Sequence, residues 1–147
     1  MELPTPDSFV LSRKAEIVAA LQAVLPEGCV IDAPEETRAY ECDALTAYRC
    51  PPLAVVLPET TEQVAAALKV CHQMNVPVVP RGAGTSLAGG SMPTSDSVVM
   101  GVARLTDVLE TDYPNRFIRV QTGRTNLSVS GAVEENGFFY APDPSSQ

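Results

Sequence analysis

The alternation of apolar and polar residues in the first third of the chain predicts an arm followed by a helix. Pro4 and Pro6 disfavour helix, so residues 1–11 are expected to be extended. Ser12 can cap a helix that continues through apolar residues at helical spacing and ends at Pro26 and Gly28; these apolar residues are Ile17, Leu21, Val24 and Leu25. Residues 29–52 show no clear pattern.

A sharper pattern begins after the proline pair at 51–52. The apolar run 53–57 is typical of a short buried strand, and Thr60 with Gln63 has the spacing of a capping box. The helix that follows is predicted to end near Met74 at Asn75, with Val64, Leu68 and Cys71 on its buried stripe. Residues 76–79 form the next short strand. Strand, helix and strand in sequence predict a βαβ unit with a parallel pair.

The last third of the chain predicts three more strands and a helix. The strands are expected at residues 97–100, 105–111 and 117–122, and the helix from Thr125 or Asn126 to Asn136 and Gly137. We expect residues 1–49 to form an N-terminal arm and helix, and residues 50–147 to form the first part of the main domain.

Composition narrows the class of protein. The chain has 147 residues, of which 45% are hydrophobic and 19% charged, as expected for a globular domain. A net charge of −8 with scattered basic residues argues against a nucleic-acid partner. No apolar run is long enough for a transmembrane segment. The N-terminus lacks the pattern of a signal peptide, so we expect a cytoplasmic location.

The four cysteines, at 29, 42, 50 and 71, include no Cys-x-x-Cys pair, so a metal site is not expected and the thiols are expected to be reduced. The single histidine, His72, is adjacent to Cys71 on a predicted helix, where neighbours point in different directions. We therefore expect Cys71 in the core and His72 on the surface.

The most informative motif is a glycine-rich loop at residues 80–90, which holds four glycines in eleven residues directly after a predicted strand. Glycine allows positive φ and close approach of a ligand, and successive backbone N–H groups can then converge on an anion. Thr85 and Ser86 add hydroxyl donors, and Arg81 adds positive charge. This pattern is typical of phosphate binding.

Two familiar phosphate-binding loops are disfavoured by the residues at key positions. Gly90 stands where a P-loop needs its lysine, and Leu87 stands where a dinucleotide-binding fingerprint needs its third glycine. The loop alone leaves two interpretations open, a phosphate-binding loop of another kind and a surface loop without a ligand.

The runs 51–68 and 78–90 together resemble the FAD-binding domain of the p-cresol methylhydroxylase and vanillyl-alcohol oxidase superfamily. Within it, they are most similar to the FAD-linked subunit of glycolate oxidase and to related D-lactate dehydrogenases. Residues 120–123 and 141–146 fall where that family places later FAD contacts. The resemblance implies an α+β fold, with a βαβ unit and a mixed sheet flanked by helices, that continues beyond residue 147.

The resemblance also implies a site. Backbone groups of the loop would cradle the FAD pyrophosphate, and a second segment would form a wall along the cofactor. The loop residues are Pro80, Arg81, Gly82, Ala83, Gly84, Thr85, Ser86, Leu87, Gly89 and Gly90, with Ala88 completing the turn; the wall residues are Pro142, Asp143, Ser145 and Ser146. The loop has no histidine for a covalent flavin link, so FAD is expected to bind non-covalently. No catalytic residue is assigned, because the family places those groups in a later domain.

The function implied is that of the FAD-binding segment of a flavin-dependent oxidoreductase that acts on a 2-hydroxy acid such as glycolate or D-lactate. The expected partners are FAD and either the missing C-terminal part or other oxidase subunits. Two alternatives remain open. In the first, the chain is a non-catalytic fragment or split-gene half that needs a partner polypeptide. In the second, it is a phosphate-binding module that does not bind flavin.

Overall fold

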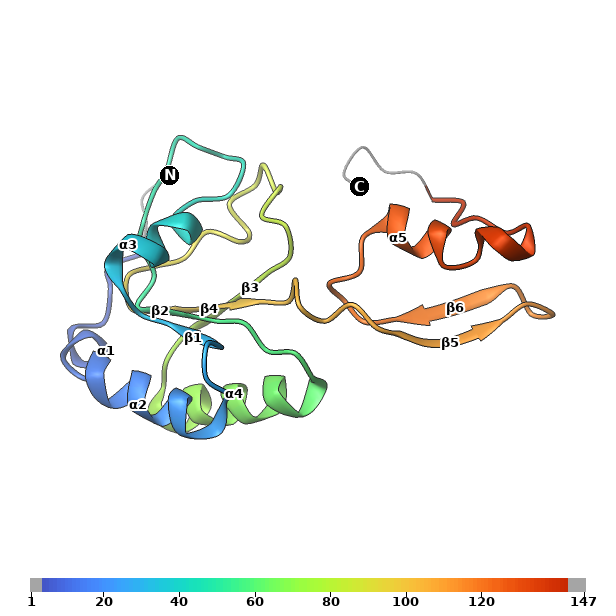
Figure 1. Ribbon diagram of the computed structural model, residues 1–147. Coiled ribbons are helices and arrows are strands. Elements are labelled where there is room, and N and C mark those ends of the chain that lie inside the picture. The colour runs from blue at the N-terminus through green and yellow to red at the C-terminus, as the bar shows by residue number, and fades with distance from the viewer. Residues whose placement is uncertain (1–3, 143–147) are drawn as a thin grey trace. The chain divides into compact units, whose positions relative to one another are not determined.

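The computed structural model describes residues 4–142, and the chain forms two compact units, Met1–Val102 and Ala103–Gln147. The predicted boundary between residues 49 and 50 lies inside the first unit, and it stays a prediction. The elements of the first unit are α1 (Ser8–Ser12), α2 (Lys14–Val24), β1 (Val30–Ile31), α3 (Pro34–Thr37), the 3₁₀ helix η1 (Arg38–Tyr40), β2 (Ala54–Val56), α4 (Thr61–Met74), β3 (Val78–Arg81) and β4 (Val98–Gly101) (Figure 1).

The first unit is built on a four-stranded sheet with the order β1-β2-β4-β3, in which only β1 is antiparallel to its neighbour. The predicted βαβ unit, β2-α4-β3, is parallel, but the two strands are not adjacent because β4 lies between them. Every residue of β4 is buried, as suits a central strand, whereas β3 contains Pro80, which has no N–H and so suits an edge.

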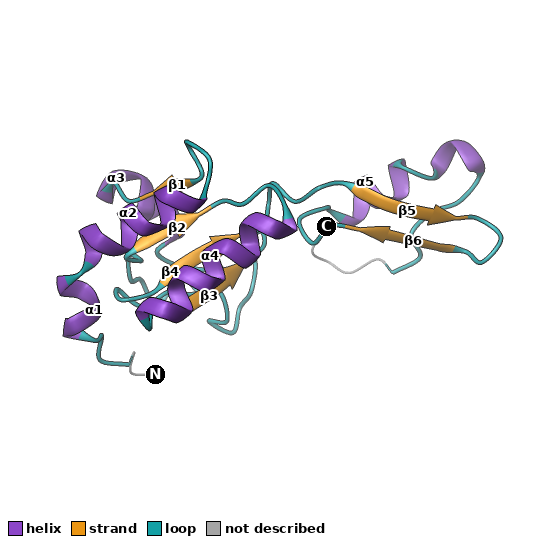
Figure 2. Cartoon of the chain, turned by 90° about the horizontal axis from the view of Figure 1, so that it is seen from below, coloured by secondary structure: helices purple, strands orange, loops and turns teal. Residues whose placement is uncertain are grey.

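The core of this unit lies between the sheet and the pair α2 and α4, which contact each other and cover one face of it (Figure 2). Ile17, Leu21 and Cys71 are buried there, as predicted, and His72 is exposed. The predicted stripe on α4 is wrong at Leu68, which is 43% exposed. The neighbouring Ala67 takes its place in the core, since the small side chain fits close to the sheet.

The prediction for the N-terminus is corrected in two respects. A short helix, α1, occupies residues that were expected to be extended, because Asp7 caps it by accepting a hydrogen bond from the N–H of Phe9. Ser12 does not cap the following helix. Its hydroxyl donates instead to the carbonyl of Phe9 at 2.8 Å, and α2 begins two residues later at Lys14.

The predicted ends of α4 are confirmed. The hydroxyl oxygen of Thr60 accepts from the N–H of Gln63 at 3.2 Å, and the Gln63 side chain accepts from the N–H of Glu59 at 2.8 Å. The return bond of the capping box is therefore displaced by one residue. Asn75 closes the helix in the left-handed conformation, with φ of 56°.

The second unit contains an antiparallel hairpin of β5 (Val108–Asp112) and β6 (Phe117–Val120), followed by α5 (Asn126–Gly131) and the 3₁₀ helix η2 (Glu134–Asn136). Thr125 caps α5 by accepting from the N–H of Ser128, as predicted. The predicted end at Gly137 belongs to η2 instead, where Gly137 has φ of 75°. Within residues 4–142, no helix is both long and apolar enough to cross a bilayer.

Candidate functional site

The glycine-rich loop begins at the carboxyl end of β3. Because β2, β4 and β3 are mutually parallel, their carboxyl ends meet at the same edge of the sheet. That edge is where open α/β sheets commonly bind ligands. The loop and the segment 41–50 lie on the side of the sheet opposite α2 and α4 (Figure 1).

The loop presents a row of unused hydrogen-bond donors. The backbone N–H groups from Gly82 to Leu87 make no hydrogen bond to any residue in the described part of the chain. Gly84 and Gly89 have φ of 72° and 76°, a conformation that L side chains disfavour. Unpaired N–H groups in an ordered loop must be satisfied by water or by a ligand, so the loop is chemically suited to an anion.

The hydroxyl groups predicted to help this loop have different environments. Ser86 Oγ accepts from the N–H of Ala88 at 3.2 Å and so stabilises the turn within the loop. Thr85 is exposed, as are Ala83 and Leu87, the last at 74%.

Arg81 is anchored inside the protein. Its Nη1 donates to the carbonyl of Cys42 at 2.7 Å and reaches the carbonyl of Ser91 at 3.5 Å. Its guanidinium carbon lies 5.7 Å from the centre of the Tyr40 ring. It forms no ion pair with any carboxylate among residues 4–142. Among these residues, Arg81 is therefore held by two backbone carbonyls and an aromatic ring.

The segment 41–50, which shows no pattern in the sequence, contacts this site through Arg81. The N–H of Cys50 donates to the carbonyl of Glu41 at 2.8 Å, and Arg49 pairs with the Glu41 carboxylate at 3.0 Å, so the segment is closed on itself. Asp43 in its middle is 4% exposed. Its Oδ1 accepts from the N–H of Leu45, while its Oδ2 has no partner in the described structure.

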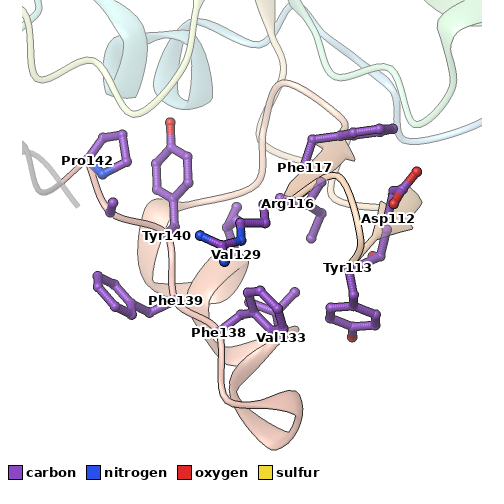
Figure 3. A pocket seen from close by; sticks show the side chains of 13 residues that line it. Asp112, Tyr113, Arg116, Phe117, Val129, Val133, Phe138, Phe139, Tyr140 and Pro142 are labelled. Carbon is purple, nitrogen blue, oxygen red and sulfur yellow. The ribbon is translucent and has the colours of Figure 1, made fainter.

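The second predicted wall is only partly visible. Asp143, Ser145 and Ser146 lie outside the described residues. Pro142 lines a cavity of about 540 Å³ in the second unit, between the β5–β6 hairpin and the segment after α5 (Figure 3). Sequence analysis did not identify this cavity, although the run Phe138, Phe139 and Tyr140 that lines it is a visible aromatic cluster. The ring centres of Tyr113 and Phe138 lie 5.2 Å apart there.

Burial affects two cysteine thiols of the first unit, Cys50 in segment 41–50 and Cys71 in α4. Burial raises the pKa of the Cys71 thiol to about 11, so this group stays protonated at neutral pH. Burial likewise raises the pKa of Cys50. No group of metal-ligating side chains is found within residues 4–142. What the site offers is a set of backbone donors and one anchored guanidinium.

Comparison with known proteins identifies relatives across most of the chain. Residues 52–147 match the family described as FAD binding domain. Glycolate oxidase subunit GlcD of Escherichia coli K12 is 46% identical over 134 residues, which cover 91% of this chain and 27% of that protein. Mitochondrial D-2-hydroxyglutarate dehydrogenase of Bos taurus is 32% identical over 145 residues, 95% of this chain and 26% of that protein. The chain thus spans about a quarter of the length of these relatives.

Solved structures support the predicted fold class. Alkyldihydroxyacetonephosphate synthase superposes with a TM-score of 0.80 at 20% identity, covering 98% of this chain and 28% of that one. p-Cresol methylhydroxylase superposes with a TM-score of 0.75 at 17% identity, covering 90% and 26%. At such identities the likeness concerns the fold, and the expected α+β fold of the p-cresol methylhydroxylase type is confirmed.

Proposed function

The chain belongs to the family of FAD-binding domains, and from that premise we propose that it is the FAD-binding segment of a flavin-dependent oxidoreductase acting on a 2-hydroxy acid such as glycolate or D-lactate. The substrate class is proposed from its similarity to proteins named glycolate oxidase subunit and D-lactate dehydrogenase. In such an enzyme the flavin would take up the hydride from the α-carbon of the substrate.

The observation that carries this proposal is the row of unpaired N–H groups from Gly82 to Leu87. A pyrophosphate needs several donors at close range, and glycines permit that approach. The backbone turns at Gly84, where φ is 72°, and this supports the assignment of a cradle to the loop. We assign the loop residues 80–90 to the pyrophosphate, and Pro142, Asp143, Ser145 and Ser146 to a second wall.

The mode of binding is proposed to be non-covalent. The loop contains no histidine, and the one histidine of the chain, His72, is on the exposed side of α4. Acid precipitation of flavin-loaded protein is expected to release all of the flavin into the supernatant. Flavin absorbance that stays with the washed pellet would contradict this mode.

The experiment that tests the function is a titration of the purified chain with FAD, riboflavin and ADP, followed by flavin fluorescence and calorimetry. FAD is expected to bind more tightly than riboflavin, because riboflavin lacks the pyrophosphate that the loop would hold. Binding of ADP without any preference for FAD would instead favour a phosphate-binding module that does not use flavin. Binding of none of the three, either by the chain alone or after a complementary polypeptide is added, would reject the site.

A second candidate is a segment that works only with a partner polypeptide, either the remainder of a longer protein or another subunit of an oxidase. It is favoured by the share of about a quarter that this chain covers in its relatives. We further propose a cytoplasmic location, which suits the four free cysteines. Recovery of flavin binding only after a second polypeptide is added would select this candidate.

A further inference from the structure

We propose that Arg81 is a positioning residue, whose guanidinium holds the glycine-rich loop in its anion-binding shape without contacting the phosphates itself. The inference rests on the proposed function of the loop. It departs from the role that positive charge beside a phosphate site ordinarily suggests, in which the guanidinium pairs with the anion.

The first support is the direction in which the guanidinium donates. Nη1 is directed to the carbonyls of Cys42 and Ser91, which belong to two segments far apart in sequence from one another. Ser91 follows the last glycine of the loop, so a side chain at the loop's first turn is bonded to its end. The same group bonds the loop to segment 41–50.

The second support is the packing of the faces of the guanidinium. The Tyr40 ring lies within cation–π distance of Cζ. Gly84 lies against the same group, because a Cβ atom at Gly84 would meet Nη2, Cζ and Nε of Arg81. The backbone of Gly84 therefore packs closely beside a guanidinium whose Nη1 is already directed to two carbonyls.

The third support is the state of the loop's own donors. The N–H groups from Gly82 to Leu87 have no partner in the described chain, so the loop is not held in shape by its own ladder of hydrogen bonds. The internal bonds nearby, from the N–H of Ala88 to Ser86 Oγ and from the N–H of Met92 to the carbonyl of Gly89, close only its far side. Beside the pairing of β3 with β4, the bridge through Arg81 ties the near side of the loop to segment 41–50 and to Ser91 at the end of the loop.

The test compares Arg81→Met, Arg81→Lys and the control Arg119→Met in the full chain. Arg119 is an exposed side chain paired with Glu110 in the second unit, so its replacement removes the same charge outside the unit that contains the loop. Three quantities are measured: affinity for FAD and for riboflavin, the dependence of FAD affinity on salt, and amide hydrogen exchange without ligand.

If Arg81 positions the loop, Arg81→Met weakens FAD binding by about tenfold or more, because hydrogen bonds from a charged donor are lost. The affinity for riboflavin stays near the wild-type value. The salt dependence of FAD binding stays unchanged, since no charge–phosphate contact is lost. Lysine does not restore affinity, because an ammonium lacks the planar guanidinium that packs near the Tyr40 ring and Gly84.

Three results would overturn the inference. One is recovery of FAD affinity in Arg81→Lys together with a flatter salt dependence in Arg81→Met, which would make Arg81 a direct phosphate ligand. Another is equal behaviour of Arg81→Met and Arg119→Met. The third is an equal loss of affinity for FAD and for riboflavin in Arg81→Met, which would indicate general destabilisation of the fold.

Hydrogen exchange separates failure of this inference from failure of the proposed function. The amides of Cys50 and Met92 are bonded within the two segments that Arg81 joins. They are expected to exchange faster in Arg81→Met than in wild type even with no ligand present. Faster exchange without any FAD binding would keep the structural role and reject the cofactor, whereas unchanged exchange would reject the role of Arg81.

Discussion

Gly84 lies directly against the guanidinium of Arg81, in a position where a Cβ atom would overlap the arginine side chain. Its φ of 72° is in the left-handed region as well. Two independent constraints, one of conformation and one of space, therefore require glycine at this residue. Gly82, two residues earlier, has neither constraint: no atom lies within 4 Å of a Cβ placed there.

The pair Gly84 and Gly82 provides a matched test of the site. Gly84→Ala is expected to weaken FAD binding by about tenfold, because the left-handed backbone costs about 1–2 kcal/mol for an L residue and the guanidinium must also move. Gly82→Ala is expected to bind FAD nearly as the wild type does. Titration of both variants with FAD checks this, and equal affinities would remove the loop from the site.

Local signals in the sequence were enough for elements whose ends are set by neighbouring residues. Thr60 with Gln63, Thr125 and Asn75 all act as predicted, since each bonds to a group within four residues. The missed α1 and the wrong cap at Ser12 were errors of local interpretation, whereas the error in strand order arose from distant contacts. The position of β4 between β2 and β3 depends on pairing across the sheet.

The candidate site shows the same division. The glycine-rich loop could be predicted from residues 80–90 alone, because glycine content is a local property. The contact between Arg81 and the carbonyl of Cys42 spans 39 residues and uses a backbone atom, so no residue type marks it. Segment 41–50 therefore went unrecognised, although it supports the loop.

The buried carboxylate of Asp43 leads to a second prediction. Its Oδ2 has no partner within the described chain, and an unpaired buried charge is destabilising. Asp43→Asn keeps the acceptor for the N–H of Leu45 and removes the charge. We expect the free energy of unfolding in urea to stay the same or to rise. A loss of more than about 1 kcal/mol would show that the charge itself is paired.

The contact between Asp7 and Asp96 predicts a dependence of stability on pH. Burial raises the pKa of Asp96, but the N–H of Asp7, the Thr94 side chain and its own N–H outweigh this and hold the pKa below its usual value. Because the pKa of Asp96 is lower in the folded state, its ionisation stabilises the fold at pH values above the ordinary aspartate pKa of about 3.9. This stabilisation is lost as the pH falls through the folded-state pKa.

Unfolding of wild type and Asp96→Asn in urea at several pH values checks this. Wild type is expected to be the more stable at pH 7, because a charged acceptor bonds the N–H of Asp7 more strongly than an amide does. The difference is expected to shrink towards zero in acid. A difference that is constant from pH 7 into acid would mean that the charge of Asp96 contributes nothing.

The chain alone is expected to bind FAD weakly and to show no turnover of glycolate or D-lactate. The second unit explains the weakness: its sheet has two strands, which are marginal alone in water, and Leu109, Phe117 and Phe139 are 56%, 46% and 76% exposed. A complementary polypeptide that covers these side chains would bind only the folded form, so it should raise both the melting temperature and the FAD affinity.

Phe139→Ser is expected to reduce that gain, whereas Phe9→Ser, at an exposed residue in α1 of the first unit, is not. Reduction of FAD by either acid is measured with the chain alone, as bleaching at ~450 nm above a protein-free control. Such bleaching would contradict the expectation, because it would mean that the flavin needs no further protein to position the substrate.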